Sequence, residues 1–182
     1  DINALATGDQ GGFFGFDDSG GLIFNPNGDF DDLREGESRD THWVYTLFDA
    51  EGASDTATVT VTVQGVNDAP VGADDAFDAD EDGGFSLGSP VANDTDPDSS
   101  WLYMSLNGLT GTNGGSFSAD DSGNLIFIAG TDFDDLNVGE TRQTSYTYNV
   151  NDAEGAQAAA TVLVTVHGNN DGPVGGDDSF TV

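Results

Sequence analysis

The stretch that decides the fold is Thr-Ala-Thr-Val-Thr-Val-Thr-Val-Gln, residues 56–64. Apolar residues and threonines alternate along it, so one face of an extended chain is apolar and the other is polar. A period of two with β-branched residues is typical of a strand that packs one face on a core. Residues 161–167 repeat the pattern with Val162, Val164 and Val166. The sequence therefore predicts a strand at both places.

Shorter segments with the same alternation surround these two stretches. Residues 43–47, 102–106 and 146–150 alternate large apolar side chains with smaller or polar ones. Glycine, asparagine and aspartate separate the segments, and apolar residues do not recur at helical spacing. Short strands in a unit of about 100 residues predict an all-β fold of tandem immunoglobulin-like sandwiches. The side chains expected to face the core are Phe24, Trp43, Tyr45, Leu47, Leu102, Met104, Leu106, Phe127, Tyr146, Tyr148 and Val150.

An internal repeat indicates how many such units the chain contains. Asp17-Asp18-Ser19-Gly20 recurs as Asp120-Asp121-Ser122-Gly123, and Asp49-Ala50-Glu51-Gly52-Ala53 recurs as Asp152-Ala153-Glu154-Gly155-Ala156. Both copies follow at an offset of 103 residues, so the alignment needs no gap. A period of that size is that of a domain and lies well above the periods of solenoid repeats. The chain is therefore predicted to carry tandem domains.

The domain boundary is expected at the Gly-Val-Asn-Asp-Ala-Pro stretch, residues 65–70. Residues 1–68 then form the C-terminal two-thirds of one repeat, and residues 69–172 form a complete repeat. Residues 173–182 are expected to be the first strand of a following repeat. Neighbouring repeats of the same protein are therefore the first partners we expect.

Composition excludes several classes of protein. The chain has 34 Asp and Glu against 3 Lys and Arg, a formal net charge of −31. A nucleic acid or an anionic membrane surface requires a basic face, which this chain cannot form. No apolar run approaches the roughly 18 residues of a spanning helix, so this segment is not expected to insert into a membrane. With no cysteine, stability must come from packing or from bound ions.

Acidic residues cluster in one region without cationic partners. Between Asn67 and Asp98 the chain carries ten Asp and Glu residues and neither Lys nor Arg. Asp94, Asp96 and Asp98 follow one another at a spacing of two along a proline-stiffened loop. Calcium takes 6 to 8 oxygen ligands from carboxylates, amides and carbonyls, and this spacing suits it. The alternative is a solvated acidic face, which is what most charge runs are.

Several motifs in fixed order resemble the cadherin-like and VCBS-type repeats of large bacterial surface and biofilm adhesins. The resemblance covers essentially the whole chain, and the motifs are specific together although each is weak alone. They are Asn67-Asp68-Ala69-Pro70-Val71, Asp74-Asp75-Ala76-Phe77 with Asp80-Glu81-Asp82, Ala92-Asn93-Asp94-Thr95-Asp96-Pro97-Asp98, Val138-Gly139-Glu140-Thr141 and Tyr148-Asn149-Val150-Asn151-Asp152. The resemblance implies a cadherin-like sandwich and an extracellular location, secreted or on the bacterial cell surface.

The resemblance also implies which residues bind calcium. In cadherin-like arrays an acidic first-strand residue, an Asp-x-Asp loop, a linker Asn-Asp and an Asp before the final strand gather around calcium at the domain junction. Carried over to this sequence, the implied ligands are Glu81, Asp94, Asp96, Asp98, Asn67, Asp68 and Asp152. The full acidic linker and the Asp-Arg-Glu motif of animal cadherins are missing here, which implies one or two ions rather than three.

Other residue types offer little support for catalysis. His42 and His167 are expected to point outward from strands, and no nucleophile elbow or triad pattern accompanies them. Trp101 and Tyr103 alternate with the inward-facing Leu102 and are therefore expected to lie outside. Exposed aromatic rings could stack on a sugar, whereas the alternative is contact with a neighbouring domain. We therefore expect a non-catalytic, calcium-stiffened extension repeat of an adhesin, biofilm-matrix or filament protein, with a calcium-dependent exopolysaccharide-binding module as the rival.

The C-terminal segment suggests one further partner. Asp177-Asp178-Ser179-Phe180 matches Asp74-Asp75-Ala76-Phe77, the first strand that residues 1–68 lack. Such a segment could reach the partial repeat of another copy by strand addition. The hypothesis is head-to-tail self-assembly in which Phe180 fills the pocket that Phe77 fills in the complete repeat. The alternative is a chain that continues beyond both ends.

Overall fold

The computed structural model describes residues 3–173 and 175–181 and is built of strands. Within that range the only helical element is a short 3-10 turn, Pro90–Asn93, so the all-β prediction is confirmed. None of the helical residues in this range forms a segment able to cross a membrane. Contacts group the chain into two units. Unit 1 holds the residues up to Pro70 with Asp96–Trp101 and Asp152–Ala156, and unit 2 holds Val71–Thr95, Leu102–Asn151 and the residues from Gln157 onward.

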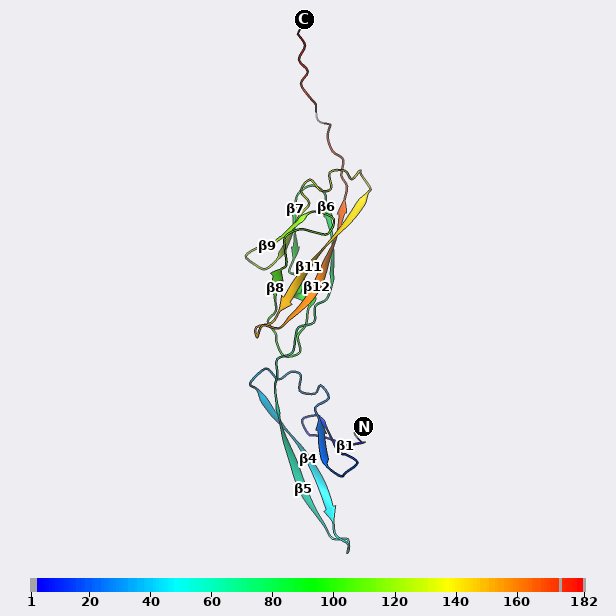
Figure 1. Ribbon diagram of the computed structural model, residues 1–182, viewed down its shortest axis with the longest axis vertical. Helices are drawn as coiled ribbons and strands as arrows, with labels where there is room; N and C mark the ends of the chain where they lie inside the picture. Colours follow the sequence, from blue (N-terminus) through cyan, green and yellow to red (C-terminus); the bar gives the residue numbers. More distant parts are fainter. Residues whose placement is uncertain (1–2, 174, 182) are drawn as a thin grey trace. The chain divides into compact units, whose positions relative to one another are not determined.

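Unit 2 is a sandwich of two sheets (Figure 1). One sheet has four strands in the order β6-β12-β11-β8, and the other has three in the order β7-β10-β9. The strand bounds are β6 Asp75–Asp80, β7 Gly84–Gly88, β8 Tyr103–Leu106, β9 Ser116–Ala119, β10 Leu125–Ile128, β11 Thr141–Asn151 and β12 Gln157–His167. This is the immunoglobulin-type sandwich that the alternation predicts.

The long β11–β12 hairpin is the centre of unit 2. Its strands pair in register from Thr141 opposite His167 to Asn151 opposite Gln157. β6 adds to the other edge of β12 as a parallel strand, which places Phe77 opposite Val164. Val162, Val164 and Val166 are fully buried, as the valine face predicted. Burying one such side chain contributes about 1.5–3 kcal/mol.

Aromatic side chains fill the space between the two sheets. The Phe117 and Tyr146 rings are stacked with their centroids 4.8 Å apart, and Phe127 lies 5.1 Å from Phe117. The Tyr146 hydroxyl accepts a hydrogen bond from the Asn107 N–H and donates one to the Gly108 carbonyl. Its polar end is therefore satisfied where the ring is buried.

Unit 1 repeats only part of this arrangement. Its strands are β1 Asn3–Thr7, β2 Phe13–Phe16, β3 Leu22–Asn25, β4 Ser38–Phe48 and β5 Ser54–Gln64. They form a three-stranded sheet, β1-β2-β3, and a two-stranded sheet, β4-β5. At the offset of 103 residues, β4–β5 corresponds to β11–β12 and pairs in the same register, from Ser38 opposite Gln64. The repeat seen in the sequence is therefore a repeat of the hairpin.

The core of unit 1 is less complete than that of unit 2. Phe14 is fully buried, with the Phe24 ring centroid at 4.9 Å and the Trp43 ring centroid at 5.8 Å. Trp43 and Tyr45 face this core as predicted, but both are only half-buried. Their counterparts in unit 2, Tyr146 and Tyr148, are buried. The same sequence pattern is therefore less completely buried in unit 1 than in unit 2.

Two glycines with similar backbone angles offer a test of packing in unit 2. Gly115 has φ 73° and Gly123 has φ 80°, a region that costs other residues roughly 1–2 kcal/mol. A Cβ on Gly115 would lie 2.4 Å from Cε2 of Phe127, whereas a Cβ on Gly123 would meet nothing within 4 Å.

We therefore expect Gly115→Ala to lower the free energy of unfolding by about 1–3 kcal/mol more than Gly123→Ala, because only Gly115→Ala adds an overlap in the core. Urea unfolding followed by circular dichroism measures both values. Equal losses would mean that the Phe127 ring does not pack on Gly115.

Candidate functional site

The loop Asp96–Trp101 is shaped by its own first residue. The Asp96 Oδ1 atom accepts hydrogen bonds from the N–H groups of Asp98 at 3.0 Å and Ser99 at 2.8 Å. An aspartate that accepts from the backbone two and three residues ahead closes a tight turn, and Pro97 limits the backbone between them. One carboxylate oxygen of Asp96 therefore builds the loop while Oδ2 is left for another partner.

The segment Asn67–Asp68 lies against this loop within unit 1. The Asp68 N–H donates to Oδ2 of Asp98 at 3.2 Å, and Nδ2 of Asn67 donates to Oδ2 of Asp152 at 2.8 Å. Nε of Arg34 donates to the main-chain carbonyl of Asp98 at 2.6 Å. Segments that are far apart in the sequence are thus joined by hydrogen bonds into one acidic group.

Asp152 organises the turn that precedes β12. Its Oδ1 atom accepts hydrogen bonds from the N–H groups of Gly155 and Ala156, and its Oδ2 atom accepts the Asn67 bond. Burial raises the pKa of Asp152, but these hydrogen bonds outweigh burial, so the pKa is lowered overall. Asp152 therefore stays ionised and orients the Asn67 amide.

Three oxygens of this group are buried without any hydrogen-bond donor. They are Oδ1 of Asn67, Oδ2 of Asp96 and Oδ1 of Asp98. The Asp98 side chain is only 6% exposed. A buried polar atom that has lost water and gained no partner is expensive, and a charged one more so. The three oxygens therefore need a positive partner, which residues 3–173 and 175–181 do not provide.

The electrostatics of Asp98 agree with that need. Burial raises its pKa, the neighbouring Asp96 carboxylate raises it further, and the Asp68 N–H lowers it only in part. The ion pairs in the described part of the chain involve Arg39, Arg142 and the two histidines, and none of them includes Asp96 or Asp98. The Asp98 carboxylate is thus held in an unfavourable environment.

The donor set fits a hard divalent cation. Carboxylate and amide oxygens, with main-chain carbonyls and water, are the ligands that calcium prefers, whereas zinc prefers sulfur and nitrogen. Within residues 3–173 and 175–181, no three His, Cys, Asp or Glu side chains stand in metal-binding geometry by themselves. The candidate site therefore combines the two carboxylates of Asp96 and Asp98 with the amide oxygen of Asn67.

Asp94 does not share this environment, although its spacing predicted a ligand. It belongs to unit 2, where Oδ1 accepts the Ala73 N–H at 2.7 Å. Its Oδ2 atom is one of three acceptors around the Tyr148 hydroxyl, at 3.3 Å, with the Pro90 carbonyl at 3.0 Å and the Asp75 carboxylate at 3.2 Å. Burial and the negative charges of Asp94 and Asp75 raise the pKa of Tyr148, so the hydroxyl stays protonated. Asp94 therefore acts as a structural acceptor, and we leave it out of the candidate site.

Glu81 also lies elsewhere, in unit 2 just after β6. It is 1% exposed, and its Oε1 atom accepts the Asn169 N–H at 2.6 Å while Oε2 has no hydrogen-bond partner. At the offset of 103 residues, Asn170 and Asp171 correspond to Asn67 and Asp68. Glu81 therefore binds the segment that follows β12 within unit 2 and is not part of the group that Asp98 forms in unit 1.

The sequence predicted that Trp101 and Tyr103 face outward, but it gave no sign of the role of Arg34. Trp101 is 63% exposed and Tyr103 is 41% exposed, which confirms that they face outward. Arg34, which holds the Asp98 carbonyl, was not predicted, because a lone arginine 64 residues away gives no local signal. The correspondence of Asn170 to the candidate ligand Asn67 follows from the repeat offset of 103 residues.

A family model and several solved structures are similar to this chain. The family model of the bacterial cadherin-like domain matches residues 67–168. None of the curated proteins matches the sequence significantly. Among solved structures, extracellular domains 1–5 of protocadherin gamma B2 are 14% identical with a TM-score of 0.44, over 87% of this chain and 31% of that chain. Human mucin-like protocadherin EC1-2 is 17% identical with a TM-score of 0.43, over 86% of this chain and 78% of that chain.

Mouse cadherin-23 EC22-24 is 15% identical with a TM-score of 0.45, over 86% of this chain and 49% of that chain. This chain thus spans less than two-thirds of several of the structures that it resembles. Cadherin-like domains are typically extracellular adhesion or extension modules. Since the family model covers more than half of the residues, the chain belongs to the bacterial cadherin-like domain family.

Proposed function

We propose that this chain is a calcium-binding, calcium-stiffened extension repeat of an extracellular bacterial adhesin, biofilm-matrix or filament protein, of the cadherin-like and VCBS type. The observation that carries the proposal is the set of three buried oxygens without donors, on Asn67, Asp96 and Asp98. A cation within reach of all three oxygens would satisfy them together and offset the repulsion between the Asp96 and Asp98 carboxylates.

Each residue of the group has a separate task in this proposal. Asn67 Oδ1, Asp96 Oδ2 and Asp98 Oδ1 are ligands, and the Asp68 carboxylate is close enough in sequence to join them. Asp152 is a positioning residue, because it holds the amide nitrogen of Asn67 and so directs Oδ1 away from itself. Arg34 fixes the main chain of the loop. Calcium supplies positive charge and flexible coordination to this arrangement.

Stiffening follows from which segments the ion would join. Asn67 and Asp68 lie in the stretch that follows β5, and Asp96 and Asp98 lie in a separate loop of unit 1. A cation bound to both would restrain the backbone on either side of Gly65–Pro70, which we propose as the boundary between repeats 1–68 and 69–172. Glu81 with Asn170 and Asp171 would form the corresponding site at the next boundary, before the segment 173–182.

Asp96→Asn separates the ligand role of Asp96 from its structural role. The asparagine can keep Oδ1 as the acceptor for Asp98 and Ser99, while an amide nitrogen replaces the proposed ligand Oδ2. For the unchanged chain, calcium at a hundredfold excess over Kd should stabilise the folded state by about 2.7 kcal/mol. We expect Asp96→Asn to lose most of that increment, as measured by thermal melts in millimolar calcium and in chelator.

Asp121→Asn is the matched control, because Asp121 is exposed in a turn and the substitution removes the same charge there. Magnesium should stabilise the unchanged chain far less, since it is smaller and gives up water reluctantly. A melting temperature that is the same in calcium and in chelator would refute the proposal, as would equal effects of the two substitutions.

Asp98→Asn should raise the stability of the metal-free protein and reduce the stabilisation that calcium provides. In chelator it removes a buried charge beside Asp96, so the metal-free protein should become more stable by about 1 kcal/mol. In calcium it removes a charged ligand, so the stabilisation by the ion should shrink. Urea unfolding in both solutions tests this reversal. A lower stability in chelator would show that the carboxylate is needed for the fold itself.

A second candidate function is binding of exopolysaccharide. The observation that favours it is the outward exposure of Trp101 and Tyr103, at 63% and 41%. Aromatic rings in such positions can stack on sugar rings. Retention of the chain on immobilised bacterial exopolysaccharide, lost in Trp101→Ala and in chelator, would support this function. Equal retention of Trp101→Ala would exclude a role for that ring.

A further inference from the structure

Glycine follows asparagine at three places in this chain, at residues 27–28, 107–108 and 113–114. In such a pair the main-chain nitrogen of the glycine lies close in sequence to the side-chain amide carbon of the asparagine, and no Cβ of the glycine obstructs its approach. The two groups are therefore able to react with each other wherever the fold leaves both of them unbound. The three pairs differ in that respect.

The fold holds two of the three asparagine side chains. Nδ2 of Asn107 donates to Oδ1 of Asn149 at 2.7 Å. Nδ2 of Asn113 donates to the main-chain carbonyl of Gln143 at 2.9 Å, and the Gly114 N–H donates to the Gly111 carbonyl at 3.3 Å. These hydrogen bonds must break before the amide carbon and the glycine nitrogen meet. Asn107 and Asn113 are therefore protected by hydrogen bonds.

Asn27 lies in a turn that leaves its side chain unbound. The turn joins β3 to β4 and is closed by a hydrogen bond from the Asp29 N–H to the Pro26 carbonyl at 3.0 Å. Asn27 has φ 53° and Gly28 has φ 77°, the positive angles of the two central residues of a type I′ turn. Both residues are exposed. Within residues 3–173 and 175–181, neither the Asn27 side chain nor the Gly28 N–H is hydrogen-bonded to protein.

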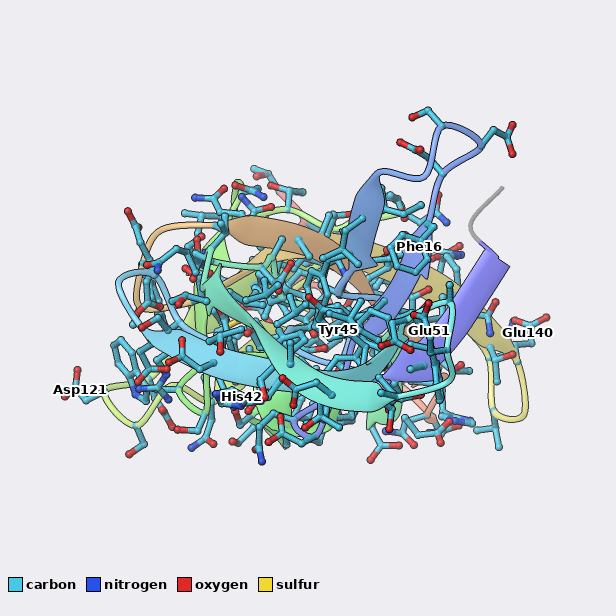
Figure 2. The ribbon with its side chains drawn as sticks, turned by 90° about the horizontal axis from the view of Figure 1, so that it is seen from below. Phe16, His42, Tyr45, Glu51, Asp121 and Glu140 are labelled. Atoms are coloured by element: carbon cyan, nitrogen blue, oxygen red, sulfur yellow. The ribbon has the colours of Figure 1, made fainter. Side chains whose placement is uncertain are left out.

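Unit 2 shows that this position is open in the repeat itself. At the offset of 103 residues, Gly130 and Thr131 correspond to Asn27 and Gly28, and both are exposed. A Cβ built on Gly130 would meet nothing within 4 Å. The openness of Asn27 therefore comes from the turn and not from the segments around unit 1. Exposure alone is not sufficient, because Asp121 also points away from the ribbon but precedes a serine (Figure 2).

We propose that Asn27 is a modification site, at which the chain deamidates without an enzyme. The Gly28 nitrogen gives its proton to hydroxide and bonds to Cγ of Asn27, and the bond from Cγ to Nδ2 breaks. The leaving nitrogen takes a proton from water and departs as ammonia. Water then opens the five-membered imide at either carbonyl, which gives aspartate or isoaspartate. One water is consumed, one ammonia is released, and one negative charge is added to the formal −31.

The modification would act on the hydrogen bond that Asp29 makes. Oδ2 of Asp29 accepts the Gly12 N–H at 2.7 Å, which joins the turn to the segment between β1 and β2. Isoaspartate adds one methylene group to the main chain just before this residue, so the Asp29 carboxylate is displaced. Unit 2 has the equivalent bond, from the Gly115 N–H to Oδ2 of Asp132 at 2.8 Å, but no asparagine in the turn. Ageing would therefore loosen unit 1 and leave unit 2 unchanged.

Peptide mapping by mass spectrometry tests the site on the full chain, kept folded in a mildly basic buffer. We expect amide loss at Asn27 to be at least about tenfold faster than at Asn107 or Asn113, because hydrogen bonds protect both of those side chains. In concentrated urea the three rates should converge, since the folded-state bonds are then absent. Equal rates in the folded chain, or a tenfold difference that persists in urea, would overturn the proposal.

Asn149→Ala is the matched control for protection. It removes the acceptor of the Asn107 side chain and should speed amide loss at Asn107 about fivefold, while the rate at Asn27 stays the same. An unchanged rate at Asn107 would show that the hydrogen bond does not control the reaction.

Hydrogen exchange at two glycine amides tests the effect on unit 1. In the aged chain the Gly12 amide should exchange about fivefold faster than in fresh chain, whereas the Gly115 amide should not change. Asn27→Gly accepts the positive φ and cannot form the imide, so the same incubation should leave its Gly12 exchange constant. Unchanged exchange at Gly12, or an equal rise at Gly115, would overturn the predicted loosening of unit 1.

Discussion

The candidate site depends on a shortage of positive charge. The chain has 34 carboxylate side chains and three arginines. Arg39 and Arg142 pair with Asp32 and Asp135, and Arg34 donates to a main-chain carbonyl rather than to a carboxylate. On an exposed surface, water and dissolved salt make such an excess tolerable. Around the buried Asp98 carboxylate they cannot, and this is the physical reason for the proposal that an external cation binds there.

The chain folds the same hairpin twice in different surroundings. β4–β5 and β11–β12 have the same length, register and offset, and both carry valines on one face. Among the residues that the structure describes, only β12 of these two hairpins has a further strand beside it and a fully buried valine face. Alternation in the sequence therefore determines which face of a strand is apolar. The completeness of burial depends on which other segments are present to cover that face.

Much of the fold could be predicted because its signals are local. The period-two valines, the separating glycines and the 103-residue offset each lie within a short window of sequence. The identity of the ligands is harder to predict, since Asp94, Asp96 and Asp98 are equivalent in spacing. Asp94 follows the Pro90–Asn93 turn and meets the buried Tyr148 hydroxyl, a contact over 54 residues that spacing alone does not show.

The remaining parts of the site arise from contacts across long stretches of chain. Asn67 meets Asp152 over 85 residues, and Glu81 meets Asn169 over 88. The family resemblance suggested Asn67, Asp152 and Glu81 but joined them into one group. The structure separates Glu81 because β6 ends beside the last residues of β12, where Glu81 N–H donates to the His167 carbonyl. The separation of Glu81 from the group around Asp98 depends on how the strands pair, and a short sequence motif does not contain that information.

The most direct test of the account is a crystal structure of the chain grown with calcium, with the ion identified by its anomalous scattering. The account predicts one ion bound by Oδ1 of Asn67, Oδ2 of Asp96 and Oδ1 of Asp98, at the roughly 2.3–2.6 Å typical of calcium. It also predicts that Asp94 keeps its bond to Tyr148. A structure in millimolar calcium in which these three oxygens instead bind water or protein donors, with no ion among them, would contradict it.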